Sequence, residues 1–197
     1  MGRLISSFCI FLLIFSSCQN NRKSLVLGRI KRASDLATTQ FTINKLVYGT
    51  KEKKLFWVID LESSRFLARS KAIVKAGIDI SELQMNDVKI EKNSISLILP
   101  HVRVLSFSYP AELFEEIDDY SEDFLFNPIN VKEKEGYFRD AEIDIRNSLK
   151  YMDIEKTTKE KTRLLFEAML KNMGFTEIYI DFKEGDLIRE VNISEIQ

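Results

Sequence analysis

Apolar and polar residues alternate through much of the first half of the chain, which is the pattern of strands with one buried face. The alternation begins at Phe41, and residues 54–60 are apolar on both faces, as in an interior strand. Residues 49–52 separate these segments and predict a hairpin turn. Residues 65–76 predict the longest strand, with small residues on one face: Ala68, Ala72 and Ala76. Further strands are predicted over 87–91, 94–99 and 102–107.

The second half changes to helical spacing. Apolar residues recur every three or four positions from about Tyr137, which marks the buried stripe of an amphipathic helix: Ala141, Ile145, Leu149 and Met152. The same spacing continues through a second set: Thr158, Thr162, Leu165, Met169 and Met173. The charged segment 153–163 predicts an interruption of the helix, and Gly174 suits its end. Residues 176–182 alternate again and predict a final strand.

Together these elements predict an α+β fold. We expect an antiparallel sheet of about five to six strands, packed against the long C-terminal helix, with a final short strand. Pro110 suits the start of a short helix over residues 111–117. The stretch from there to Lys134 has no regular period.

The N-terminal sequence predicts where the protein is located. Residues 8–15 form an unbroken apolar run, shorter than the roughly 20 residues that span a bilayer, which predicts the core of a secretory signal peptide. Two serines then precede Cys18, an order that resembles the lipobox of bacterial lipoproteins, with Phe15 where that motif usually has Leu, Ile or Val. We predict that residues 1–17 are removed and that Cys18 is lipidated. An ordinary signal peptide that is cut near Ser17 is the alternative.

Lipid chains on Cys18 would hold the protein at a membrane. The next residue is Gln19 and not the Asp that resemblance to enterobacterial lipoproteins would associate with inner-membrane retention. We therefore expect a protein of the bacterial cell envelope, attached to the outer membrane and facing the periplasm. The predicted plan is a signal peptide (1–17), lipidated Cys18 and a tether (18–40), one α+β domain (41–183) and a C-terminal tail (184–197). Within the tether, residues 25–30 are expected to pack as a short element.

Charge and composition argue against several classes of function. The chain has 29 Lys and Arg against 30 Asp and Glu, so it lacks the basic excess of a nucleic-acid-binding protein. It has one His and two Cys; Cys9 would leave with the signal peptide and Cys18 would be blocked by lipid. No phosphate loop, dinucleotide fingerprint, nucleophile elbow or zinc motif is present. We predict no cofactor, no metal and no catalytic residue, and therefore do not expect an enzyme.

Three residues are candidates for a specific role. Asp79 follows Gly77 at the end of the long strand, His101 follows Pro100 at another strand end, and Asp60 ends the segment that is apolar on both faces. The alternatives are a turn-forming carboxylate at Asp79 and a structural imidazole at His101. Residues 112–123 hold seven carboxylates, which could bind a cation or form a solvated acidic face.

Three segments in combination suggest a family. They are residues 72–80 (AIVKAGIDI), residues 95–100 (ISLILP) and residues 170–175 (LKNMGF), the last followed by an apolar strand. Over roughly residues 41–182 the chain resembles the bacterial family catalogued as domain of unknown function 4230. The resemblance implies an exported or membrane-anchored protein, and it implies no reaction, cofactor or catalytic residue.

The leading hypothesis is a non-enzymatic interaction or scaffold module of the envelope, with the membrane at Cys18 and an envelope protein as partners. The alternative is a small-molecule or lipid-binding module whose pocket lies between the small-residue strand face and the helix. A third hypothesis is a hydrolase that acts on envelope material through carboxylates.

Overall fold

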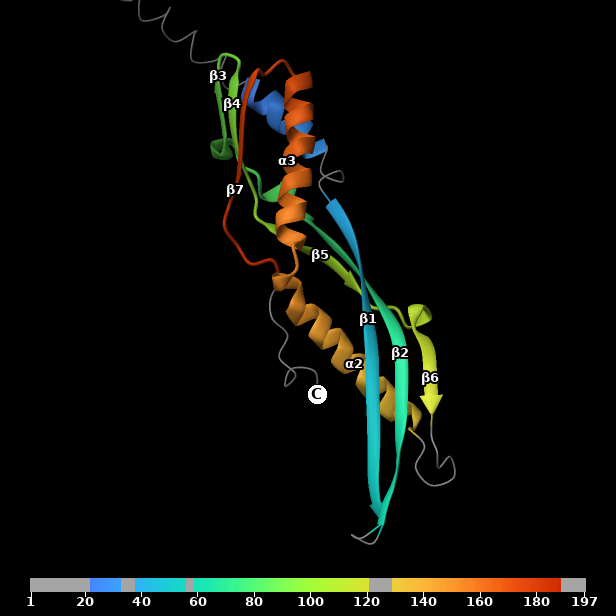
Figure 1. Ribbon diagram of the computed structural model, residues 1–197. Helices are drawn as coiled ribbons and strands as arrows, with labels where there is room; N and C mark the ends of the chain where they lie inside the picture. The colour runs from blue at the N-terminus through green and yellow to red at the C-terminus, as the bar shows by residue number, and fades with distance from the viewer. Residues whose placement is uncertain (1–21, 33–37, 56–58, 121–128, 189–197) are drawn as a thin grey trace, which may run out of the picture. The chain divides into compact units, whose positions relative to one another are not determined.

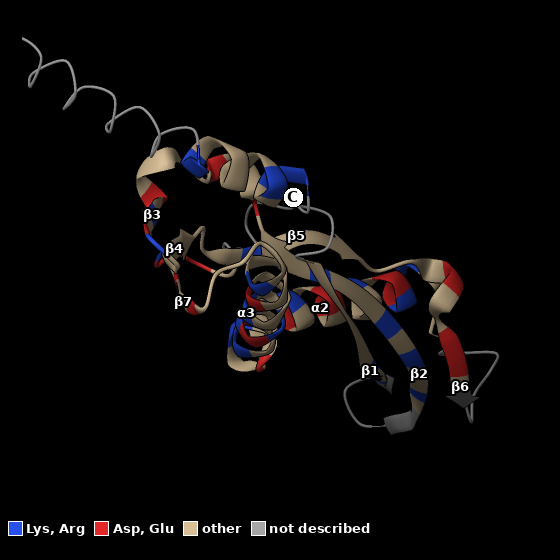
Figure 2. Cartoon of the chain, turned by 90° about the horizontal axis from the view of Figure 1, so that it is seen from above, with Lys and Arg blue, Asp and Glu red and all other residues tan. Residues whose placement is uncertain are grey.

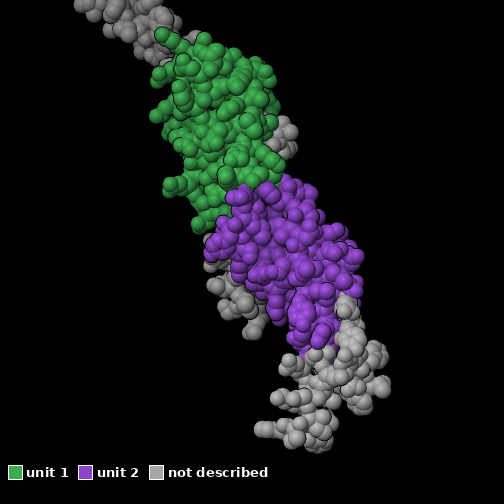
Figure 3. Space-filling model, viewed as in Figure 1, with its two compact units in different colours: residues 1–39, 76–103, 155–187 green, residues 40–75, 104–154, 188–197 purple. Residues whose placement is uncertain are grey.

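The computed structural model describes residues 22–32, 38–55, 59–120 and 129–188, and the predicted signal peptide and Cys18 lie outside these ranges. Its chain divides into two compact units (Figure 3). Unit 1 comprises residues 1–39, 76–103 and 155–187, and unit 2 comprises residues 40–75, 104–154 and 188–197. Strands and helices occur in both units, so the α+β class predicted from the sequence is confirmed.

Unit 1 contains a three-stranded sheet of order β3-β4-β7. β3 (Val88–Glu91) and β4 (Ser94–Leu99) form an antiparallel hairpin, and β7 (Glu177–Phe182) pairs parallel to β4 (Figure 1). The hairpin turns at Lys92, which has a φ of 53°. Ile95, Leu97 and Leu99 on one face of β4 are fully buried. The parallel pairing follows because a helix returns the chain to the sheet before β7.

That helix is α3 (Ile154–Asn172). Its buried stripe repeats every four residues: Thr158, Thr162, Phe166 and Leu170. The sequence placed this stripe correctly at the two threonines, but Leu165, Met169 and Met173 are only half-buried. Lys159 and Arg163 lie over the ring of Phe182, which holds α3 against β7. Gly174 ends the helical segment with a φ of 89°, as its sequence context predicts.

Unit 2 is built mainly from a four-stranded sheet and one helix. β2 (Ile59–Ile78) is central, β1 (Thr38–Leu55) lies on one side, and β5 (Val102–Ser108) and β6 (Glu115–Tyr120) pair with it on the other. α2 (Val131–Ser148) covers the inner face of this sheet. Phe66 and Ala68 of β2, Val47 of β1 and Ala141 of α2 share one apolar core with Ile129.

Short 3₁₀ turns connect the larger elements: η2 (Ile80–Glu82), η3 (Met85–Asp87), η4 (Ala111–Leu113) and η5 (Leu149–Tyr151). η5 interrupts the helical segment between α2 and α3. The sequence predicts an interruption but places it wrongly in the charged residues 153–163, which from Ile154 onward belong to the continuous helix α3. Of the predicted α2 stripe, Ala141, Ile145 and Leu149 are buried. Residues 22–32, in the predicted tether, form a helix that buries Val26 and Ile30.

Two further local predictions are wrong. No turn forms at residues 49–52, because β1 continues to Leu55 with Gly49 against the ring of Tyr137. Residues 111–117 are not one helix, since η4 is followed directly by β6. Carboxylates make β6 look like a loop in the sequence, but the strand pairs antiparallel to β2 and Glu115 forms an ion pair with Arg69. Tertiary pairing therefore overrides the low strand propensity of acidic residues here.

Candidate binding pocket

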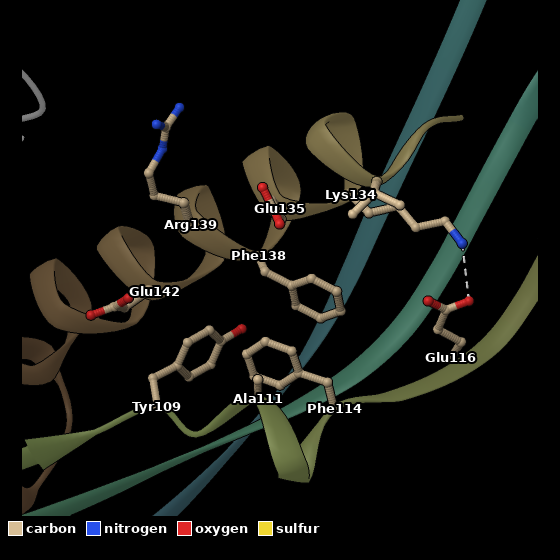
Figure 4. A pocket seen from close by; sticks show the side chains of 10 residues that line it. Tyr109, Ala111, Phe114, Glu116, Lys134, Glu135, Phe138, Arg139 and Glu142 are labelled. Carbon is tan, nitrogen blue, oxygen red and sulfur yellow. Dashed lines mark hydrogen bonds and ion pairs between the residues drawn. The ribbon is translucent and has the colours of Figure 1, made fainter. Parts of the chain in front are cut away.

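A hollow of about 500 Å³ lies in unit 2 between α2 and the segment that joins β5 to β6 (Figure 4). This volume falls in the usual range for small-molecule sites. Its lining comes from residues on both sides: Tyr109, Ala111, Phe114 and Glu116 from the strand segment, and Val131, Lys134, Glu135, Phe138, Arg139 and Glu142 from α2. Apolar atoms form most of this lining, so the hollow favours an apolar occupant.

Three aromatic rings form the wall of the pocket. The rings of Phe114 and Phe138 stack with centroids 4.1 Å apart and planes 9° apart. Tyr109 lies against Phe114 at 4.7 Å and 52°. Phe138 also meets the buried ring of Phe66 edge-on at 5.8 Å, so the wall continues into the core of unit 2. The Phe114 and Phe138 rings therefore cover each other's faces across the gap between α2 and the strand segment, and Phe66 supports them from the core.

Local sequence explains why these rings meet. Pro110 starts η4, a single turn that separates β5 from β6 along the edge of β2, and Tyr109 and Phe114 lie on either side of this turn (Figure 1). On the opposite side, α2 begins at Asn130, whose side chain accepts a hydrogen bond from the backbone N–H of Glu133 at 3.0 Å. The Glu133 carboxylate in turn accepts a hydrogen bond from the backbone N–H of Asn130 at 2.8 Å, which completes a capping box. The cap fixes where the helix starts and hence which face carries Phe138.

Charged residues surround the mouth of the pocket. Lys134 donates to the carboxylate of Glu116 at 3.1 Å, which joins α2 to β6 across one end (Figure 4). Glu142 is paired with Arg146 at 2.8 Å along the helix. Glu135 and Arg139 are exposed. Both signs are present in balance, so the mouth does not select strongly for a cation or an anion.

The polar end of Tyr109 is turned away from the open hollow. Its hydroxyl is shielded from solvent. Burial raises the pKa of Tyr109 above its ordinary value of 10.0, a hydrogen bond with the hydroxyl of the fully buried Ser70 opposes this rise, and the carboxylate of Glu142 adds to it. Tyr109 therefore offers an occupant of the hollow its apolar ring.

Asp79 lies elsewhere, in unit 1, and its role there is local. Its Oδ1 accepts hydrogen bonds from the hydroxyl and the backbone N–H of Ser81, at 2.6 and 3.0 Å, and caps η2. Arg103 donates to Oδ2 at 2.6 Å and also to Glu82 at 3.0 Å. The two bonds from Ser81, with Arg103 as a further cause, lower the pKa of Asp79 despite partial desolvation. This is the turn-forming alternative of the sequence interpretation.

His101 is also in unit 1, where its half-buried ring lies directly against Gly185 and leaves no room for a Cβ at that position. This contact is typical of a structural imidazole. Asp60 lies in β2, and its side chain is outside the described residues, as is Cys18. Neither Asp79 nor His101 lines the aromatic pocket.

The small-residue face of β2 is not a binding site. Ala68, Ala72 and Ala76 are each fully buried, so the pocket predicted beside them is absent from the described structure. The hollow lies instead where the sequence has Tyr109, Phe114 and Phe138, which the sequence interpretation did not select. The sequence did contain an indication of this site, because aromatic residues recur around Pro110 in a segment that is otherwise rich in carboxylates.

The acidic segment 112–123 is described through residue 120. Glu115 and Glu116 are engaged by Arg69 and Lys134, which places protein cations where a bound cation would otherwise lie. Within the described ranges, no three His, Cys, Asp or Glu side chains group closely enough to hold a metal ion. In the same ranges no helix is long and apolar enough to cross a membrane.

Comparison with known proteins agrees with the resemblance read from the sequence. Residues 28–180 match the model of a family described as protein of unknown function (DUF4230). The match therefore begins in the helix at residues 22–32, earlier than the expected start at Phe41. No curated protein matches the chain significantly, and no solved structure does.

Proposed function

The chain belongs to the DUF4230 family of proteins of unknown function, and from its own structure we propose that it is a lipid-anchored envelope protein that binds an apolar ligand without transforming it. The observation that carries the proposal is the aromatic pocket of unit 2, whose lining is mostly apolar. An apolar body would pack against the rings of Tyr109, Phe114 and Phe138.

The anchor in this proposal rests on the N-terminal sequence. An apolar run and two serines precede Cys18, which would carry the lipid that keeps the domain at the outer membrane, facing the periplasm. Mass spectrometry of the N-terminal peptide from the membrane fraction tests it: acyl chains on Cys18 are expected. A peptide that begins at another residue with a free thiol at Cys18 would refute the anchor.

Binding is favoured over hydrolysis by the use of the carboxylates around the pocket. Of the three carboxylates that line the pocket, Glu116 and Glu142 are each held in an ion pair with a base, Lys134 and Arg146 respectively, which leaves only Glu135 outside an ion pair among the described residues. A carboxylate-based hydrolase needs one carboxyl as an acid and a second as a base or nucleophile facing the same substrate atom. Neither residue is arranged in this way, so the pocket supports recognition rather than chemistry.

A side chain of a partner protein is the second candidate occupant of the pocket. In that case the protein would act as the interaction module that the sequence suggests. Val131 lies at the edge of the pocket and is 72% exposed, which is unusual for a large apolar side chain. An aromatic or aliphatic side chain of a partner would fill the hollow while its neighbours covered Val131, as buried anchor residues do at protein interfaces.

The test is a titration of residues 19–197 with N-phenyl-1-naphthylamine, an uncharged aromatic dye whose fluorescence rises in apolar sites. Ala111→Trp fills the hollow from an exposed position and should weaken binding at least about tenfold without loss of folding. Phe114→Ala should weaken it similarly. Phe107→Ala is the matched control, because Phe107 stacks under Arg146 in the same unit and does not line the pocket. Equal affinity in all four proteins would refute the proposal.

A further inference from the structure

The four-stranded sheet of unit 2 has a second face that α2 does not cover. On β1, Val47 and the Lys45 side chain, which pairs with Asp144, point toward α2, so the alternate residues point away from it. Leu46 and Tyr48 lie on that other side and are 60% and 61% exposed. On β2 the inner positions are fully buried and the alternate positions are exposed or half-buried. We call this second side the outer face: Leu46, Tyr48, Arg65, Leu67, Arg69, Lys71, Ile73 and Lys75.

The outer face is basic although the whole chain is slightly acidic. β2 contributes Arg65, Arg69, Lys71 and Lys75, and neither β1 nor β2 contributes an acid between residues 40–50 and 65–75. Figure 2 shows these bases as bands along β2. β6 supplies Glu115, which neutralises Arg69, and places Asp118 opposite Leu67 in the register. Among the described residues, Arg65, Lys71 and Lys75 have no ion-pair partner.

Apolar and basic side chains are interleaved on this face. Leu46 and Tyr48 stand beside the basic strand, and Leu67 and Ile73 alternate with its bases. Tyr has an apolar ring with a polar tip, and Lys and Arg extend a charge from an apolar stem, so each suits the boundary between headgroups and acyl chains. An acidic soluble protein is the alternative partner for this face. It would pair with the basic residues, but it would not account for the two exposed apolar residues, Leu46 and Tyr48, beside them.

We infer that the outer face rests on anionic lipid headgroups of the membrane that holds the chain. Each Lys or Arg near an anionic bilayer raises partitioning about fivefold, so a few such residues give weak binding on their own. A lipid at Cys18 would keep the face near the bilayer and make weak binding effective, as in any tethered pair. The inference rests on the anchor of the proposed function and is independent of the aromatic pocket.

The test uses the full acylated chain, reconstituted in vesicles of phosphatidylcholine with or without about one third phosphatidylglycerol. Asn44→Cys, at an exposed outer position of β1, carries an environment-sensitive dye, because the mature chain is expected to have no other free thiol. A dye at Lys132→Cys on α2 is the control, since this exposed position lies on the opposite layer of unit 2. We expect a blue shift at position 44 on anionic vesicles and none at position 132.

Charge-reversal variants test whether the basic residues of the outer face cause the blue shift of the dye. Lys71→Glu with Lys75→Glu should abolish the shift, whereas Lys156→Glu with Lys161→Glu on α3 changes the net charge equally and should leave it intact. Leu46→Ser with Tyr48→Ser should reduce the shift without removing its dependence on anionic lipid. These are surface positions, so the fold is retained in each variant.

Three results would overturn the inference: no shift on anionic vesicles, an equal shift on uncharged vesicles, or an equal shift with soluble polyglutamate in place of lipid. The last would assign the face to an acidic protein. Failure of the anchor is recognised separately, because an unanchored chain would leave the vesicles in an alkaline carbonate wash whatever the dye reports.

Discussion

The candidate residues of unit 1 and the pocket of unit 2 differ in how closely their side chains are engaged. In unit 1 Asp79 is held by Ser81 and Arg103, and Asp87 is held by Lys183 at 2.8 Å. In unit 2 aromatic rings separate a helix from a strand segment and leave a hollow of about 500 Å³. The residues with the most noticeable sequence context, Asp79 and His101, therefore have local structural contacts, whereas the candidate site is formed by rings whose sequence context is ordinary.

Both units have a shielded hydroxyl among their described residues. Thr158 in unit 1 is fully buried on the packed face of α3 and has no hydrogen-bond partner there. The Tyr109 hydroxyl in unit 2 is equally shielded and lies beside the hydroxyl of Ser70. Neither group is accessible to a ligand, so both bear on stability alone.

The largest expected change in stability follows loss of a core ring, and loss of a ring in the pocket wall should cost less. Phe166→Ala should lower the free energy of unfolding by about 3–5 kcal/mol, because Phe166 is fully buried in unit 1. Phe114→Ala should cost less than half of this, since Phe114 is half-buried at a hollow. Urea denaturation of both variants measures the difference. Equal losses would mean that the wall of the pocket is ordinary core.

The next largest change in stability is expected at Gly49 of β1, which the ring of Tyr137 approaches closely. Gly49→Ala puts a methyl group where the ring of Tyr137 lies and should cost about 1–3 kcal/mol, with loss of the 3.1 Å bond from the Tyr137 hydroxyl to the Thr50 carbonyl. Gly136→Ala is the matched control, because nothing lies near that position on α2, and it should stabilise by about 0.5–1 kcal/mol. Thermal unfolding distinguishes the two signs.

The third prediction concerns pH and unit 1. The pKa of Asp79 is lowered in the folded state, so its charge contributes stability above its ordinary value of 3.8, and this contribution is lost as the pH falls through the lowered pKa. Asp79→Asn should therefore cost about 0.5–1 kcal/mol at neutral pH and progressively less below pH 3.8. Unfolding curves at several pH values test this. A constant difference down to the lowest pH would exclude the charge as the cause.

The smallest effect concerns the two shielded hydroxyls. Thr158→Val removes an unsatisfied group and should raise the free energy of unfolding by up to about 1 kcal/mol. Tyr109→Phe should stabilise less, because the phenol lies beside the hydroxyl of Ser70. Urea denaturation of both variants provides the measurement, and equal gains would mean that the Tyr109 hydroxyl is as unsatisfied as that of Thr158.

Much of the fold was predictable, and the failures share a cause. Periodicity located the strands of the first half, the α2 stripe and the end of the helical segment at Gly174, because burial of one face imposes a regular spacing. It failed at Gly49, read as a turn, and at the acidic strand β6, read as a helix and loop. In both places the local preference was real, but contacts with distant residues, Tyr137 and Arg69, decided the outcome.

The sequence by itself determined the α+β class and the family, because both depend on residue types and their spacing along the chain. The anchor at Cys18 stays a prediction from the sequence. Only the tertiary structure decided where a ligand could lie. Tyr109, Phe114 and Phe138 come from two elements separated in the chain, and a hollow exists only where their packing is incomplete. Spacing records which face of an element is buried, whereas a cavity depends on how well two buried faces fit each other.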